Sequence, residues 1–414
     1  MQLTSQVGRD YFWNTASSVM AAASTVIMLL VVTRLLGEYA AGTFAFAFAL
    51  GQQFQMLGAF EVRPLHATDV EHRFGFGSYH AARLVTTGLM IAGIVVFALA
   101  SNGFTLDSLL IVLVGFLRVF DAFEDVFHGE FQRLGRLDVA GRAYFYRTLI
   151  TTVLFTAALA ATGDLLVTCV VTIAGSFVAL IALNLPAARA RYAIAPTFVA
   201  SAVGSLLRTC LPLFFGAFLS VFLSSAPRFG IEHFLSREEQ TYYAILFMPA
   251  LVINLLGLAI FKPLLTTMAV HWNGHDRAAF LGVVRRGLLA VVAATAVTFG
   301  ISWAIGLPLL GFIYGVDLSA FLTELLVLVA GGAFNAAGVV LYYALVTMRS
   351  QRHVFVGYVA AAAAVAAMVL LLIPRLGMLG ACLAYGGAMA LLAAVFAGFF
   401  VVGIGRSPAS ASAR

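Results

Sequence analysis

The chain has 414 residues, of which 62% are hydrophobic and only 10% are charged, and its mean hydropathy is +1.01. A water-soluble protein of this length needs more ionisable side chains to cover its surface. The composition therefore excludes a soluble globular protein and predicts a protein embedded in the lipid bilayer. The net charge of +6 is interpreted first as a signal of membrane topology and second as affinity for anionic lipid headgroups. Binding of nucleic acid is the least favoured of the three interpretations.

A bilayer-spanning helix needs roughly 20 mostly apolar residues. Twelve candidate segments are joined by short polar loops, and no soluble domain fits between them. They are residues 11–33, 43–62, 84–101, 107–127, 143–162, 165–185, 206–223, 242–262, 287–305, 320–345, 354–373 and 378–404. The sequence therefore predicts an all-α integral membrane protein with twelve transmembrane helices.

The orientation follows from the basic residues, because Arg and Lys resist translocation. With the N-terminus in the cytoplasm, nineteen basic residues lie inside, four lie outside, and Arg118 lies within the membrane. The inside set is Arg9, Arg63, Arg73, Arg83, Arg133, Arg136, Arg142, Arg147, Arg189, Arg191, Arg208, Lys262, Arg277, Arg285, Arg286, Arg349, Arg352, Arg406 and Arg414. The outside set is Arg34, Arg228, Arg237 and Arg375. Both termini are predicted to be cytoplasmic.

The first two segments are joined by a short glycine-bounded turn, residues 34–42. An outward Arg34 is uncommon, so it is a candidate contact for an anionic substrate; the alternatives are interfacial snorkelling and pairing with a nearby carboxylate. The second segment carries Gln52, Gln53 and Gln55. Amides at this depth should face another helix or a wet cavity, so Gln52 is a candidate substrate ligand, with helix-to-helix hydrogen bonding as the alternative.

Residues 61–83 mix ionisable side chains with aromatics and glycines on the cytoplasmic side. The spacing of His66, His72 and His80 matches no trusted metal-ligand pattern, so the segment is interpreted as a solvated loop. The three cysteines fall in or beside membrane segments and indicate neither disulfides nor a metal site. We predict no metal and no bound cofactor.

The fourth segment contains the unusual stretch GFLRVFDAFEDVFHGEF. Arg118, Asp121, Glu124 or Asp125, and His128 recur at intervals of three to four residues, so they share one helix face. One hypothesis is a charged stripe in a central cavity that exchanges protons or a cation. The alternative is a helix that ends near residue 120, with these charges in a cytoplasmic loop.

The second half follows a linker at residues 184–196 that holds two prolines and two arginines. Arg228 lies at the outer end of the seventh segment and is a second candidate for an anionic substrate; Glu232, four residues on, is the alternative partner. Asn254, in the middle of the eighth segment, is a further candidate substrate ligand. The small-residue run 330–338 (AGGAFNAAG) predicts close helix packing.

The chain contains an internal repeat, in which residues 35–65 align without gaps with residues 234–264, 199 positions later. Both copies end in a basic residue, a proline and a leucine, so that Arg63 corresponds to Lys262. Such a trace is typical of transporters built from two halves, with the substrate between them. It predicts that Arg63 and Lys262 face each other across one inward mouth and hold a diphosphate; the alternative is that both are ordinary positive-inside anchors. The predicted parts are a six-helix lobe (1–185), a cytoplasmic linker (186–200), a second six-helix lobe (201–405) and a disordered tail (406–414).

The chain resembles polysaccharide flippases of the multidrug/oligosaccharidyl-lipid/polysaccharide exporter superfamily over nearly its whole length. The likeness is carried by RLLGEYAAGTFAFAFAL after the first segment, APRFGIEHFL before the eighth, LGMLGACLAYGGA at the start of the twelfth, and the six-plus-six order. The resemblance implies two six-helix bundles, related by a pseudo-two-fold axis around a cavity open alternately to each side. It further implies movement of an undecaprenyl-diphosphate-linked oligosaccharide across the bacterial plasma membrane.

The sequence lacks a GxxxxGK[ST] loop and the HEXXH and GxSxG motifs, so direct use of ATP and an enzymatic role are not expected. Three hypotheses remain: a lipid-linked oligosaccharide flippase, a cation-coupled small-molecule or drug antiporter of the same superfamily, and a multi-pass enzyme of envelope biosynthesis. A flippase cavity should be cationic and polar, whereas an antiporter cavity should be acidic and otherwise apolar. The expected driving force is a Na⁺ or H⁺ gradient or the membrane potential, and the expected partners are membrane lipids and polysaccharide assembly proteins.

Overall fold

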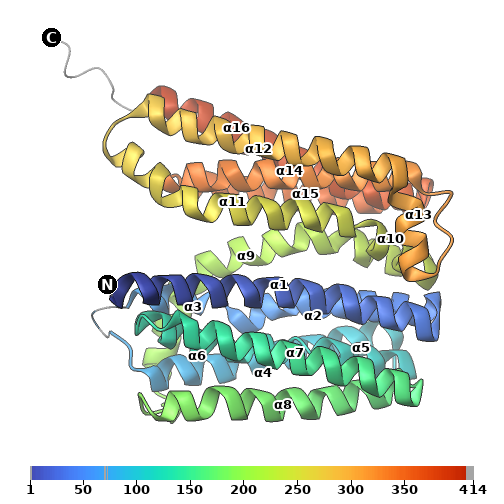
Figure 1. Cartoon of the computed structure of the whole chain (residues 1–414), viewed down its shortest axis with the longest axis horizontal. Coiled ribbons are helices and arrows are strands. Elements are labelled where there is room, and N and C mark those ends of the chain that lie inside the picture. The colour runs from blue at the N-terminus through green and yellow to red at the C-terminus, as the bar shows by residue number, and fades with distance from the viewer. Residues whose placement is uncertain (1, 70, 72, 407–414) are drawn as a thin grey trace. The chain divides into compact units, whose positions relative to one another are not determined.

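The structure, a computed structural model, describes residues 2–69, 71 and 73–406, with only the backbone described for 2–5, 254–266, 405 and 406. Every regular element in this part of the chain is a helix (Figure 1). The prediction of an all-α protein is therefore confirmed. The predicted tail, 406–414, lies outside the described residues apart from Arg406, the last residue of α16.

The helices follow one another with short connections. The first eight are α1 (Gln2–Leu36), α2 (Glu38–Ala59), α3 (Val62–Thr68), α4 (Phe76–Asn102), α5 (Leu106–Phe116), α6 (Val119–Arg133), α7 (Leu137–Thr162) and α8 (Leu165–Arg189). The remaining elements are α9 (Ala200–Phe234), α10 (Arg237–Leu246), α11 (Met248–Asn273), α12 (Arg277–Ile301), the π-helical η1 (Ser302–Gly306), α13 (Leu307–Tyr314), α14 (Leu322–Thr347), α15 (Gln351–Leu376) and α16 (Met378–Arg406).

All twelve predicted segments fall on helices. Within the described residues, nine helical stretches are long and apolar enough to cross a membrane. These comprise α1, α4, α7, α8, α9, the continuous stretch from α12 to α13, α14, α15 and α16. The segments in α2, α5–α6 and α10–α11 are helical but lie outside this set. A count of twelve spans and a two-fold relation between halves therefore remain predictions.

The fourth predicted segment is broken in its middle and the eighth near its start. Between α5 and α6, Leu117 N–H bonds to Val114 O at 3.2 Å and Arg118 N–H bonds to Gly115 O at 3.1 Å, which is a tighter turn than an α-helix makes. The eighth segment breaks at Phe247, between α10 and α11. The break in the fourth segment separates the apolar α5 from the charged α6.

The predicted turn after the first segment is a single residue. α1 ends at Leu36 and α2 begins at Glu38, and Gly37 connects them with φ +85° and ψ −176°. This backbone conformation is open to glycine and strained for any residue with a Cβ atom. The glycine therefore allows two long helices to reverse direction within one residue.

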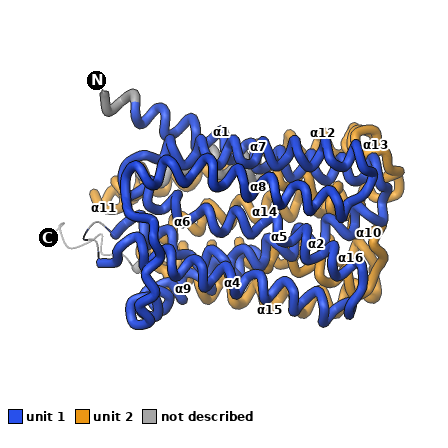
Figure 2. Tube along the Cα trace, turned by 90° about the horizontal axis from the view of Figure 1, so that it is seen from below, with its two compact units in different colours: residues 1–221 blue, residues 222–414 orange. Residues whose placement is uncertain are grey.

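The chain forms two compact units, residues 1–221 and 222–414, and the division falls inside α9 (Figure 2). Of the predicted linker 186–200, residues 186–189 belong to α8 and residue 200 begins α9, while most of the residues between them form no helix. The predicted six-helix lobes, with boundaries at 185 and 200, remain a prediction.

The interpretation of residues 61–83 as a solvated loop is wrong. His66, Asp69, Tyr79 and Arg83 are all buried. The His66 ring stacks on the Tyr79 ring at a centroid distance of 3.9 Å, and the Tyr79 hydroxyl donates to Asp69 at 2.9 Å. The error arose because polar composition was equated with solvation, although paired polar groups can be buried when their hydrogen bonds are satisfied.

An aromatic core lies in the first unit beneath this segment. Phe60 stacks on Phe214 at a centroid distance of 4.4 Å, and Phe76, Phe127 and Phe131 pack in the same buried cluster. These rings hold together the end of α2, the start of α4, α6 and the first half of α9. The core therefore holds α6 firmly where its charged residues lie.

In the second unit, the small-residue run packs as predicted. A Cβ atom added to Gly331 would lie 3.0 Å from Gly386 Cα, and one added to Gly332 would lie 3.0 Å from Ala250 Cα. Such distances leave no room for a side chain. α14 therefore approaches both α16 and α11 at backbone contact, which only glycine permits.

Candidate functional site

The acidic residues Asp121, Glu124 and Asp125 lie on α6, directly after the break at Leu117 and Arg118. The alternative expected a helix end near residue 120, and α5 does end close to it, at Phe116; the charges that follow do not form a loop, because α6 continues to Arg133 and Glu124 is fully buried. The arrangement of buried ion pairs centred on this helix is called here the α6 network. Its members are Arg63, Arg83, Arg118, Asp121, Glu124, Asp125, Arg147 and Asn184.

Asp121 is held by two arginines from different helices. Its carboxylate accepts a hydrogen bond from Arg118 Nη1 at 2.8 Å and another from Arg147 Nη2. The Arg118 guanidinium also lies 4.0 Å from the centroid of the Phe48 ring, a cation–π contact. The carboxylate is thus oriented by α7 as well as by its own helix.

Glu124 lies one turn further along and is completely enclosed. Its Oε2 accepts from Arg147 Nε at 2.5 Å, and its Oε1 accepts from Asn184 Nδ2 at 2.7 Å. Arg147 therefore bridges Asp121 and Glu124 while α8 supplies the amide. A buried carboxylate survives only with such partners, because an unpaired charge in a low-dielectric interior is very costly.

Asp125 faces two further arginines. Arg83 Nη2 donates to it at 2.7 Å, and Arg63 Nη1 lies 3.4 Å away. Arg83 is itself fully buried and donates through Nη1 to Gly58 O at 2.5 Å. A Cβ atom on Gly58 would lie 2.8 Å from the Ala122 Cβ, so glycine is needed for α2 and α6 to approach. Arg63 is the more exposed partner, and its Nε also donates to Gln132 Oε1 at 3.2 Å.

Two cavities in the first unit meet the exposed side of the α6 network. One has a volume of about 580 Å³ and the other about 210 Å³. Both are lined by Gln55, Arg63, Asp121 and Asp125. The larger one adds Met56, Ala59, Glu61, Pro64, Ala67, Thr68 and Gln132, and the smaller one adds Asn14, Ser17, Ser18, His128, Leu137, Ala140, Gly141 and Tyr144.

The cavity walls are polar, but their charges are balanced. The α6 network contains four arginines and three carboxylates, and Glu61 on the wall of the larger cavity adds a fourth carboxylate. The two cavities at the α6 network are therefore not cationic as predicted: Arg63 lines both of them, while Arg83, Arg118 and Arg147 pair with the carboxylates from outside their linings. In the part of the chain that the structure describes, no group of three His, Cys, Asp or Glu side chains could hold a metal ion.

The other predicted substrate residues of the first unit lie elsewhere. Arg34 is exposed at the end of α1, and Gln52 is exposed on α2, outside the linings of both cavities. The neighbouring amide of Gln53 donates to Phe218 O at 3.2 Å, which is the hydrogen bonding expected under the alternative. Of the three glutamines, Gln55 is the one that faces both cavities.

Arg228, in the second unit, lies among aromatic rings. Its guanidinium is 5.6 Å from the Phe247 centroid and 5.9 Å from that of Tyr243. Its predicted alternative partner, Glu232, instead accepts from Arg237 at 2.7 Å. The prediction of a pair four residues apart was wrong because a turn brings α10 back onto the end of α9.

Asn254 and Lys262 belong to α11, but their side chains lie outside the described residues. Their predicted roles, including the facing of Arg63 and Lys262, remain predictions.

Sequence reasoning missed three members of the α6 network. Arg83 and Arg147 were assigned to cytoplasmic basic clusters, and Asn184 was assigned to the linker. All three are buried within helices that are long enough to cross a membrane. The sequence did contain a signal, because an arginine inside a long apolar helical segment needs a carboxylate partner. The stretch that forms α6 was the segment that offered several carboxylates.

The helical arrangement is that of a multi-pass membrane protein, and it is the fold found in solved structures of MOP superfamily transporters. No family model matches this sequence, and no curated protein sequence matches it. Among solved structures, a MOP superfamily transporter from Pyrococcus furiosus is similar with a TM-score of 0.59 and 13% identity, over 97% of this chain and 95% of that one.

Two functionally different transporters also share the fold. The lipid II flippase MurJ in an inward closed conformation matches with a TM-score of 0.65 and 14% identity, over 93% of this chain and 87% of that one. An inward-facing multidrug resistance MATE family transporter matches with a TM-score of 0.63 and 13% identity, over 96% and 94%. These neighbours are transporters and flippases rather than enzymes, and identities this low establish the fold alone.

Proposed function

We propose that this protein is a flippase that moves an undecaprenyl-diphosphate-linked oligosaccharide across the bacterial plasma membrane by alternating access, with both termini in the cytoplasm. The observation that carries the proposal is the polar wall of the two first-unit cavities. Its uncharged ligands Asn14, Ser17, Ser18 and Gln55 suit sugar hydroxyls. The similarity to a lipid II flippase is consistent with a lipid-borne cargo.

Arg63 is the residue that we assign to the diphosphate. Its guanidinium lines both cavities and holds Asp125 only at 3.4 Å, while Arg83 holds the same carboxylate at 2.7 Å. A diphosphate can therefore take over Arg63 without leaving Asp125 unpaired. A planar guanidinium binds phosphate oxygens through two parallel hydrogen bonds. This interaction is stronger than the single 3.4 Å contact that Arg63 makes with Asp125.

A cation-coupled small-molecule antiporter is the second candidate. It is favoured by the carboxylates of Asp121 and Asp125, which line both cavities, whereas Arg83 and Arg147, which pair with them, line neither. Binding a cation or proton at Asp121 would compete with Arg118 and Arg147. Such competition is a physical route by which an ion gradient could drive a change of conformation.

Reconstitution into liposomes separates the two candidates. Purified protein is assayed with a fluorescent lipid-linked oligosaccharide, whose outer-leaflet fraction is measured by quenching, and in parallel with a cationic dye under an imposed Na⁺ or H⁺ gradient. A flippase should move the lipid and ignore the dye. Arg63→Ala should abolish lipid movement, whereas the control Arg208→Ala, an exposed arginine outside both cavities, should not. Dye transport without lipid movement would overturn the proposal in favour of the antiporter.

A further inference from the structure

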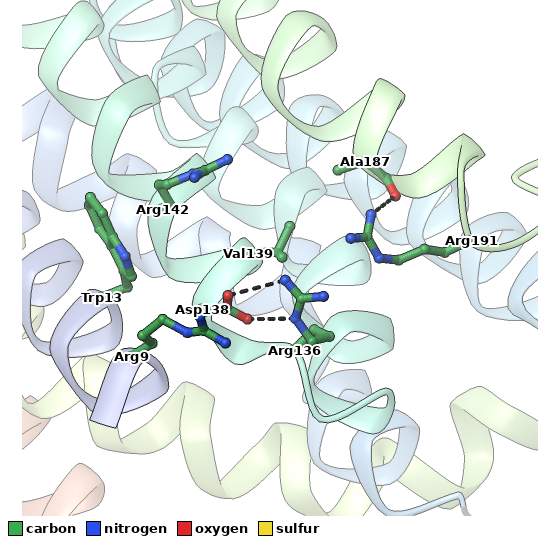
Figure 3. Close-up of a pocket in the computed structure, with 8 residues that line it drawn as sticks. All are labelled: Arg9, Trp13, Arg136, Asp138, Val139, Arg142, Ala187 and Arg191. Carbon is green, nitrogen blue, oxygen red and sulfur yellow. Dashed lines mark hydrogen bonds and ion pairs between the residues drawn. The ribbon is translucent and has the colours of Figure 1, made fainter. Parts of the chain in front are cut away.

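A third cavity of the first unit is strongly basic, and none of its lining residues belongs to the α6 network (Figure 3). It has a volume of about 440 Å³. It forms where α1 and α7 begin and α8 ends. The lining residues are Arg9, Trp13, Arg136, Asp138, Val139, Arg142, Ala187 and Arg191.

The only carboxylate in this lining is already used. Asp138 accepts from Arg136 Nε at 2.9 Å and from Arg136 Nη2 at 3.2 Å, as the dashed lines of Figure 3 show. It also accepts from Gln6 Nε2 at 2.9 Å, and its backbone N–H donates to Asp10 at 2.7 Å. The pair is therefore a structural link between the starts of α1 and α7, in which Arg136 offsets the charge of Asp138; the Asp10 carboxylate accepts from Gln6 and from the Asp138 N–H and lies outside the cavity lining.

Three arginines around the cavity keep their charge available. Arg9 bonds to the amide oxygen of Gln6, and Arg191 donates to Ala187 O at 2.7 Å, both neutral acceptors. Arg142 has no hydrogen-bond or ion-pair partner among the described residues. Three unneutralised guanidinium groups around one concave site repel one another, so an anion bound there is stabilised by all of them.

The cavity also has the features of a membrane interface. α1, α7 and α8 are all long and apolar enough to cross a bilayer, and the cavity lies at one end of each. Trp13 is held between Phe145 and Tyr146, at centroid distances of 5.8 and 5.9 Å. Aromatic rings beside arginines at helix ends are typical of the depth at which lipid headgroups lie.

We propose that this cavity binds a phosphate group carried by an anionic membrane phospholipid. Positive-inside topology accounts for basic residues on this side of the membrane, but it does not require them to converge on a cavity. The inference goes beyond the proposed transport function and does not depend on it, because the site is separate from the cavities of the α6 network and binding is measured without transport.

The test is lipid binding to the purified full-length protein in detergent, followed by native mass spectrometry. The probes are phosphatidylglycerol, the zwitterionic phosphatidylcholine, and phosphatidylglycerol in competition with millimolar inorganic phosphate. The test variant is Arg9→Gln with Arg142→Gln. The matched control is Arg208→Gln with Arg352→Gln, which removes the same charge from two exposed arginines outside the cavity.

We expect the test variant to bind phosphatidylglycerol about tenfold more weakly than the wild type, as loss of charge-assisted bonds implies, with the control unchanged. Phosphatidylcholine should bind weakly to all three proteins, and inorganic phosphate should not compete. Equal binding by test and control variants would overturn the proposal, and potent competition by inorganic phosphate would reassign the site to the free anion. Should the double variant misfold, Arg142→Gln alone carries the test, because this exposed side chain supports no other residue in the described chain.

Discussion

Arg147 is the residue on which the α6 network depends most, and replacing it by methionine tests that view. Its side chain is 2% exposed and holds both Asp121 and Glu124, whose side chain is 0% exposed. Arg147→Met keeps most of the side-chain volume and removes the charge. Two carboxylates then face each other in the interior with one cation fewer.

The loss of stability in Arg147→Met depends on which partners Asp121 and Glu124 keep. Breaking a buried ion pair by removing one partner costs about 3–5 kcal/mol. Asp121 keeps Arg118 and Glu124 keeps the Asn184 amide, so we expect the lower end of this range. For a unit of this length, about 3 kcal/mol corresponds to a fall of roughly 6–12 °C in the unfolding midpoint.

The assay is thermal unfolding of the purified protein in detergent, with a double-mutant cycle. Adding Glu124→Gln to Arg147→Met should restore roughly 1–2 kcal/mol, because glutamine keeps the bond to Asn184 without a buried charge. The control is Arg136→Met, which breaks an ion pair whose arginine side chain is 39% exposed and should cost about 1 kcal/mol or less. An Arg147→Met protein as stable as this control, or strictly additive double-mutant losses, would refute the reasoning.

Three further predictions concern transport and pH. Asp121→Asn should reduce transport of the reconstituted protein at least tenfold, yet lower the unfolding midpoint less than Arg147→Met does, because the Glu124 pair survives; unchanged transport across a range of pH would contradict this. Arg63→Ala with Lys262→Ala should weaken binding of the diphosphate-linked substrate more than tenfold, or roughly 1.4 kcal/mol, measured by lipid titration, and normal affinity would leave both residues as topological anchors. Burial lowers the pKa of His66 below its usual 6.5, although its 2.7 Å contact with Glu130 opposes this, so stability should fall as the pH drops through about 6.5. His66→Gln should flatten that part of the unfolding profile, and an equally steep profile in the variant would count against the assignment.

Part of the protein could be predicted from sequence because the bilayer imposes simple rules. An apolar stretch of sufficient length must be helical in lipid, and this alone places most of the helices from α1 to α16. The sequence also predicted the tight turn at Gly37 and the close helix packing at residues 330–338, because both depend on the size of local side chains. The periodicity of α6 correctly placed Asp121, Glu124 and Asp125 on one helix.

Sequence patterns predicted a residue's environment less well where that environment depends on a partner far away in the chain. Glu124 is stable in the interior only because Arg147 and Asn184, 23 and 60 residues away, reach it from α7 and α8. In the same way, His66 belongs to the polar segment 61–83 but is buried, because its ring nitrogen pairs with Glu130, 64 residues away.

What the sequence by itself determined is the helical membrane class, since hydropathy and helix length act locally along the chain. What only the tertiary structure decided is the charge of the cavity wall. That charge depends on which arginines stand close enough to each carboxylate to neutralise it, and such distances arise from helix packing, which no local pattern records.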